Sequence, residues 1–158
     1  MDVVVIGIGQ SLRGDDGAGL EAVRRWQEKY PQTARRVRVE AAGLPGLGLL
    51  DLTAGARAAV IVDAVRADSL PPGRVLRLSP DEAAAFAPGS GSAHGWGAAE
   101  ALALSRALDP SPTACQIRLV GIVGATFALG AGLSPEVRAA LDEAAAAIEE
   151  EVGRLLLP

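Results

Sequence analysis

The chain has 158 residues, of which 49% are hydrophobic and 22% are charged, and its formal net charge is −4 at pH 7. This length suits one domain, which we expect over residues 1–158, and the composition is that of a globular chain. The acidic balance provides no basic surface for nucleic-acid phosphates, and no apolar run reaches the roughly 20 residues that a membrane span needs.

The only cysteine, Cys115, excludes an internal disulfide, a thiolate metal cage and an iron–sulfur site. It precedes a predicted strand and fits the role of a small buried residue. No basic and apolar leader precedes the first predicted strand, so we expect a cytoplasmic protein. We also expect a monomer.

Predicted strands and helices alternate along the first half of the chain. Residues 3–8 form an almost continuous apolar run, which is typical of a strand covered on both faces of a parallel sheet. Leu20, Val23 and Trp26 then recur at helical spacing. In chain order we expect a strand over 2–8, a helix over 17–29, a strand over 36–41, a short helix over 47–53 and a strand over 57–63.

The second half continues with a strand over 73–78, a helix over 80–86, a glycine- and serine-rich loop over 88–95, a helix over 96–107 and a strand over 116–122. Ser134 is a suitable N-cap and Pro135 fits the first turn of a helix, so the last helix is expected over 134–153. We interpret the acidic run Glu149–Glu151 on that helix as a solvated face.

This order predicts a three-layer α/β/α sandwich around a mixed, mostly parallel five-stranded sheet. Only nine residues, two of them prolines, separate Asp63 from Gly73. A parallel return needs a dozen or more residues, so strand 73–78 should run antiparallel to strand 57–63 as a wide hairpin.

The turn after the first strand carries two adjacent carboxylates, Asp15 and Asp16. Gly7 and Gly9 begin a dinucleotide-binding pattern, but Leu12 occupies the position of its third glycine. Negative charge in this turn would repel a pyrophosphate. Since ligands of such sheets bind beyond the carboxyl ends of the strands, the turn predicts a cation site there.

Three residues are candidates for this chemistry, and each has a structural alternative. Asp16 could cap a helix, although Asp15 alone is enough for that task. Asp63 follows a buried apolar run and could instead form a strand-end turn or a salt bridge with Arg66. His94 is the only histidine, lies in the glycine-rich loop and could be a bystander.

Together, two carboxylates and one imidazole suit a divalent ion such as nickel, zinc or cobalt and leave coordination positions open. Other catalytic arrangements are less well supported. Ser90 or Ser92 could join His94 in a triad, but no Gly-x-Ser-x-Gly elbow follows a strand.

Four motifs then occur in order: GIGQSLRGDDGAG at 7–19, VDAV at 62–65, SAHGWG at 92–97, and VGIVG at 120–124 with GAGLSPEV at 130–137. In these motifs the chain resembles the hydrogenase maturation proteases, the nickel-dependent endopeptidases that process the large subunit of nickel–iron hydrogenases. The resemblance covers essentially the whole chain. It carries the family's metal-binding and catalytic residues onto Asp16, Asp63 and His94.

The resemblance implies an endopeptidase that removes the C-terminal extension of a nickel-loaded large-subunit precursor. The nickel would come with the substrate, and other divalent ions fit the same ligands. The nucleophile could be a water molecule bound to the metal, or a water molecule activated by a carboxylate acting as general base. The sequence leaves both alternatives open. The alternatives are a non-proteolytic metal-binding docking factor or chaperone for the same subunit, and a small-molecule hydrolase or phosphorylase-like enzyme.

Two positions depart from the family pattern. Gln10 replaces the usual asparagine, and both side chains are amides. Residues 40–46, EAAGLPG, lack the aspartate and threonine of the family's Asp-Gly-Gly-Thr-x-Gly. The second departure bears on which large subunit is the target.

Overall fold

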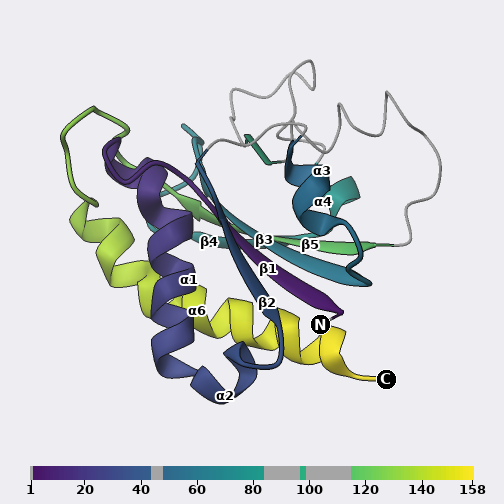
Figure 1. Ribbon diagram of the computed structural model, residues 1–158. Coiled ribbons are helices and arrows are strands. Elements are labelled where there is room, and N and C mark those ends of the chain that lie inside the picture. The colour runs from purple at the N-terminus through teal and green to yellow at the C-terminus, as the bar shows by residue number, and fades with distance from the viewer. Residues whose placement is uncertain (1, 44–47, 84–96, 99–114) are drawn as a thin grey trace.

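Five strands form one sheet in the computed structural model, which describes residues 2–43, 48–83, 97–98 and 115–158 (Figure 1). The strands are β1 (Val3–Ile8), β2 (Arg38–Ala42), β3 (Ala58–Val65), β4 (Val75–Leu78) and β5 (Gln116–Val123), and their spatial order is β2-β1-β3-β5-β4. The four strands β2, β1, β3 and β5 pair in parallel, whereas β4 pairs antiparallel with β5. The predicted mixed, mostly parallel sheet is confirmed.

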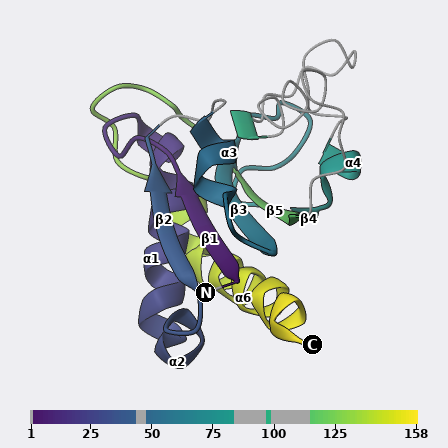
Figure 2. The same ribbon diagram turned by 45° about the vertical axis from the view of Figure 1, so that its right-hand side comes forward.

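Helices cover both faces of the sheet (Figures 1 and 2). One face carries α1 (Ala18–Lys29) and α6 (Pro135–Leu156), with the short α2 (Pro31–Ala34) beside them, and the other face carries α3 (Gly48–Thr53) and α4 (Pro80–Ala83). A 3-10 turn, η1 (Gly14–Gly17), joins β1 to α1. The short helix α2 was not among the predicted elements, because its four residues are too few for a helical repeat to be recognised.

Strand alternation divides the core into two layers. Val3 and Val5 of β1 pack towards α1 and α6, while Val4 and Ile6 pack towards α3 and α4, and all four are fully buried. Because both faces of β1 and β3 are covered, these strands lack the polar alternation of a half-exposed sheet. The apolar runs that predicted buried strands are therefore a consequence of this packing on both faces.

The predicted hairpin between strands 57–63 and 73–78 is wrong. β4 does run opposite to β3, but β5 lies between them and is the strand that β4 pairs with. Two strand spacings are only about 10 Å, which a nine-residue connection can cross easily. Such a connection limits the direction of the returning strand without fixing which strand becomes its neighbour.

The interpretation of Glu149–Glu151 as a solvated face is also wrong for two of the three residues. Glu151 is 2% exposed and its carboxylate accepts hydrogen bonds from Arg77 Nε (3.1 Å) and Arg118 Nε (3.0 Å). Glu149 accepts a hydrogen bond from Trp26 Nε1 at 2.8 Å, which ties α6 to α1. Only Glu150 is exposed.

The remaining predictions for the ends of the chain agree more closely with the structure. Ser134 caps α6 and accepts a hydrogen bond from the Val137 N–H at 3.3 Å. Cys115 is half-buried rather than buried, and burial raises the pKa of its thiol. No helix within the described ranges has the length and apolar character to cross a membrane. The predicted loop 88–95, nearly all of helix 96–107 and residues 84–86 lie outside the described residues.

Candidate active site

The turn after β1 folds back tightly against the start of α1. Gly9 has a φ angle of 151°, and a Cβ atom at this position would overlap the backbone carbonyl oxygen of Asp16. Glycine at position 9 is therefore required for the chain to return so closely on itself. The return places Asp15 and Asp16 at the carboxyl end of β1, as the sequence predicted.

Asp15 is a buried structural anchor. Its Oδ2 accepts hydrogen bonds from the N–H groups of Ala125 (2.7 Å) and Thr126 (3.1 Å), and its Oδ1 accepts one from the Ser134 N–H (2.7 Å). Burial by itself would raise the pKa of the Asp15 carboxyl, but these hydrogen bonds outweigh burial and lower the pKa below its ordinary value. Asp15 thereby fixes the β1–η1 turn to the loop between β5 and α6.

Neither aspartate caps α1 with its side chain, because the N-cap of that helix is Gly17 and no side-chain hydrogen bond is made there. Capping is therefore not the role of Asp16. Instead, Asp16 is half-buried and its Oδ2 accepts a hydrogen bond from the backbone N–H of Gln10 at 3.0 Å. No hydrogen bond to Oδ1 is found among the described residues.

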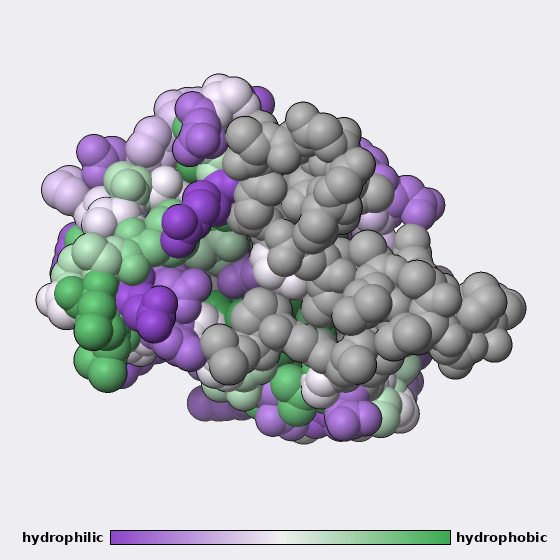
Figure 3. All heavy atoms as spheres, turned by 90° about the horizontal axis from the view of Figure 1, so that it is seen from above, coloured by the Kyte–Doolittle hydropathy of each residue, from purple (hydrophilic) through white to green (hydrophobic). Residues whose placement is uncertain are grey.

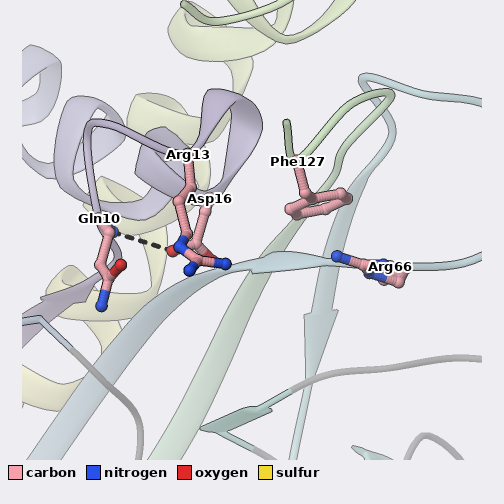
Figure 4. A pocket seen from close by; sticks show the side chains of 5 residues that line it. All are labelled: Gln10, Arg13, Asp16, Arg66 and Phe127. Atoms are coloured by element: carbon pink, nitrogen blue, oxygen red, sulfur yellow. Dashed lines mark hydrogen bonds between the residues drawn. The ribbon is translucent and has the colours of Figure 1, made fainter. Parts of the chain in front are cut away.

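Asp16 opens onto a cleft of about 460 Å³. The described residues that line this cleft are Gln10, Arg13, Asp16, Arg66 and Phe127 (Figure 4). Gln10, Arg13 and Asp16 come from the turn after β1, whereas Arg66 follows β3 and Phe127 lies on the loop after β5. Three neighbouring strands thus contribute to the cleft, which lies where parallel α/β sheets bind their ligands.

Two arginines line the cleft together with Asp16, although the sequence predicted only negative charge in this turn. The Arg66 guanidinium lies 4.4 Å from the centre of the Phe127 ring, and Arg13 extends from the opposite wall (Figure 4). Both side chains are exposed, and neither forms an ion pair with the described residues. Arg13, Arg66 and Phe127 could not be recognised as cleft residues from the sequence, because only the fold brings the three loops that carry them together.

Asp63 lies deeper than predicted. It belongs to β3, two residues before the strand ends, and it pairs with Gly121 of β5 in the sheet register. The residue is 4% exposed, and its oxygens accept hydrogen bonds from the N–H groups of Ala64 (2.9 Å) and Ala98 (3.2 Å). Asp63 is not among the described residues that line the cleft.

His94, the third predicted site residue, lies outside the described residues. Within the described part of the chain, no three His, Cys, Asp or Glu side chains gather closely enough to hold a metal ion. The structure thus places two of the three predicted site residues on the neighbouring strands β1 and β3 or just after them. The predicted set of three ligands stays a prediction.

Figure 3 shows the molecule from above, with hydrophilic surface and a continuous hydrophobic area side by side. Two of the three exposed large hydrophobic residues in the described part are Leu12 and Leu129, which lie on the loops after β1 and β5.

Comparison with known proteins identifies the class of protein to which this fold and cleft belong. Residues 20–151 match the hydrogenase maturation protease family. The chain is 31% identical over 139 residues to the hydrogenase expression/formation protein HupD of Thiocapsa roseopersicina, a match that spans 87% of this chain and 61% of that longer protein. It is 28% identical over 154 residues to the hydrogenase 2 maturation protease of Escherichia coli, spanning 95% and 92% of the two chains.

A solved structure agrees over the whole fold. The [NiFe] hydrogenase maturation protease HybD from Thermococcus kodakarensis superposes with a TM-score of 0.71 at 34% identity, covering 96% of this chain and 99% of that one. Fold and matches together define an endopeptidase, a hydrolase of peptide bonds. The chain belongs to the hydrogenase maturation protease family.

Proposed function

We propose that this protein removes the C-terminal extension of a nickel-loaded hydrogenase large-subunit precursor, acting as a monomer in the cytoplasm. The observation that carries the proposal is the position of Asp16 in a chain of this family. Its carboxylate is half-buried at the carboxyl end of β1 and lines the cleft, and Oδ1 makes no hydrogen bond to the described residues. A carboxylate held by one oxygen and open at the other is suited to meet a substrate.

In this proposal nickel is part of the substrate, and Asp16, Asp63 and His94 bind it. Two carboxylate oxygens and an imidazole nitrogen are suitable donors for such an ion. The backbone N–H groups of Ala64 and Ala98 hold the Asp63 carboxylate in a fixed orientation. In this proposal an unloaded precursor offers these residues no metal to bind and is left uncut.

Hydrolysis adds water across the scissile C–N bond, so the site must orient the carbonyl group and accept a proton from the attacking water. Nickel bound to the substrate supplies a positive charge near the scissile carbonyl. Asp16 lines the cleft, and its Oδ1, which accepts no hydrogen bond from the described residues, serves as the acceptor for the metal or for the proton of the water. Gln10 holds the other oxygen, which fixes the orientation of the carboxylate.

Intact mass measurement tests this function. The precursor from the same source is incubated with the protein in its nickel-loaded and nickel-free forms. We expect the loaded form alone to lose a C-terminal peptide. If the loaded precursor binds tightly without any change in mass, the protein is a docking factor rather than a protease.

A further inference from the structure

The rim of the cleft carries two leucines that the fold leaves exposed. Leu12 is 74% exposed on the turn after β1, and Leu129 is 76% exposed on the loop between β5 and α6. Each lies close in sequence to a residue that lines the cleft, Leu12 beside Arg13 and Leu129 two positions after Phe127. The third exposed large hydrophobic residue of the described chain, Leu157, lies near the C-terminus, at the opposite end of the molecule from η1 (Figure 1).

The two leucine-bearing loops are fastened to each other by backbone hydrogen bonds. The N–H of Gly130, next to Leu129, donates to the carbonyl oxygen of Leu12 at 2.8 Å. The same loops are joined by Gly14 N–H to the Ala131 carbonyl oxygen at 3.0 Å and by Asp15 N–H to the Thr126 carbonyl oxygen at 2.8 Å. These bonds hold both leucines on one platform.

The anchoring of Asp15 stiffens this platform further. Its carboxylate accepts the three N–H groups of Ala125, Thr126 and Ser134, all of which belong to the second loop. A loop backbone held in this way has little conformational freedom left to lose when a partner covers its side chains, which favours binding. Isolated exposed leucines need no explanation, but a pair on an interlocked rim beside an active-site cleft does.

We infer that Leu12 and Leu129 form a docking surface for an apolar patch of the precursor protein, next to the extension that enters the cleft. This inference rests on the proposed function, since it takes the occupant of the cleft and the occupant of the rim to be one polypeptide. Leu12 is next to Arg13 and Leu129 is two positions from Phe127, and both Arg13 and Phe127 line the cleft, so a protein whose scissile segment reaches Asp16 passes beside both leucines. Covering an exposed leucine removes apolar surface from water, which contributes to the affinity of the complex.

The test compares three leucine-to-serine variants of the full chain. Leu12→Ser and Leu129→Ser remove the proposed docking surface, and Leu157→Ser is the matched control, because it removes a leucine that is also mostly exposed (66%) but lies far from the cleft. The dissociation constant for the nickel-loaded precursor and the KM and kcat of its cleavage are measured for each variant. We expect each rim variant to raise the dissociation constant and KM about tenfold with kcat unchanged, and Leu157→Ser to match the original protein.

Each result decides between the two proposals. Unchanged binding and KM in both rim variants would overturn the docking surface while leaving the protease function intact. An equal loss in Leu157→Ser would overturn it too. Binding without cleavage by the original protein would overturn the protease function, and the dissociation constants would still test the rim.

Leucine methyl spectra provide a readout that does not depend on changing the rim. The Asp16→Asn protein, in which we expect cleavage to be arrested, is mixed with the loaded precursor. The methyl signals of Leu12 and Leu129 should shift, and those of Leu157 should not. Unshifted rim signals in a formed complex would overturn the inference.

Discussion

The two adjacent aspartates, Asp15 and Asp16, have different roles in the site. Asp15 turns inward and accepts three backbone N–H groups, whereas Asp16 turns toward the cleft and is held through one oxygen only. The same residue type therefore has a structural role at one position and a proposed catalytic role at the next. The difference lies in burial and hydrogen bonding, which adjacent identical letters in a sequence do not reveal.

This difference predicts that two matched substitutions change the free energy of unfolding by different amounts. Asp15→Asn should lower the free energy of unfolding by about 3 kcal/mol, because an amide cannot replace a carboxylate that accepts three buried N–H groups. Asp16→Asn should leave stability nearly unchanged. Urea denaturation of both variants measures the two effects, and equal losses would contradict this prediction.

The contribution of Asp15 should also depend on pH. Because folding lowers the pKa of this carboxyl, its stabilisation is complete above the ordinary value of 3.8 and is lost as the pH falls through the lower pKa of the folded state. The difference between the original protein and Asp15→Asn should therefore be constant near neutral pH and shrink below about pH 4. A difference that grew on acidification would contradict this assignment.

At the scale of elements, helix α6 binds the sheet through charge as well as through apolar packing. Glu151 lies buried between Arg77 of β4 and Arg118 of β5, so the helix is joined to the two strands that complete the sheet. Burial acts to raise the pKa of Glu151, but hydrogen bonds and charge attraction from Arg118 and Arg77 outweigh it and lower the pKa. Glu150 also pairs with Arg77, but at the exposed surface.

Neighbouring glutamates on α6 therefore offer a second matched comparison. Glu151→Gln should cost about 2 kcal/mol, since it leaves two arginines facing a neutral side chain in a buried position. Glu150→Gln should cost less than about 1 kcal/mol, because exposed ion pairs are screened by water and salt. The midpoints of urea denaturation test this prediction. Equal losses of stability in the two variants would show that the ion pairs of Glu151 with Arg77 and Arg118 do not hold the helix on the sheet.

These elements also show how far the sequence could predict the fold. The buried strands and α1 follow from local apolar patterns, the start of α6 follows from Ser134 and Pro135, and all of these are confirmed. The neighbour of β4 and the burial of Glu151 depend on contacts between residues far apart in the chain, which no local pattern contains. The arginines that line the cleft are hidden from sequence reasoning for the same reason.

At the scale of the whole molecule, the sheet brings three loops to one edge and leaves the opposite end to the termini (Figure 1). The loops after β1, β3 and β5 supply the cleft, and two of them also carry the exposed rim leucines. The motifs predicted Asp16 and Asp63 near this edge, because the carboxyl ends of parallel strands meet there. The third predicted ligand, His94, comes from a segment that local patterns could assign only to a loop.

The most direct test of the account is cleavage of the nickel-loaded precursor by the original protein and by Asp16→Asn, followed by intact mass. Both proteins are compared at a temperature where each is fully folded, with Asp142→Asn, an exposed aspartate on α6, as the control. The account predicts loss of the C-terminal extension with the original protein and the control, and none with Asp16→Asn. Normal cleavage by a folded Asp16→Asn protein would contradict it.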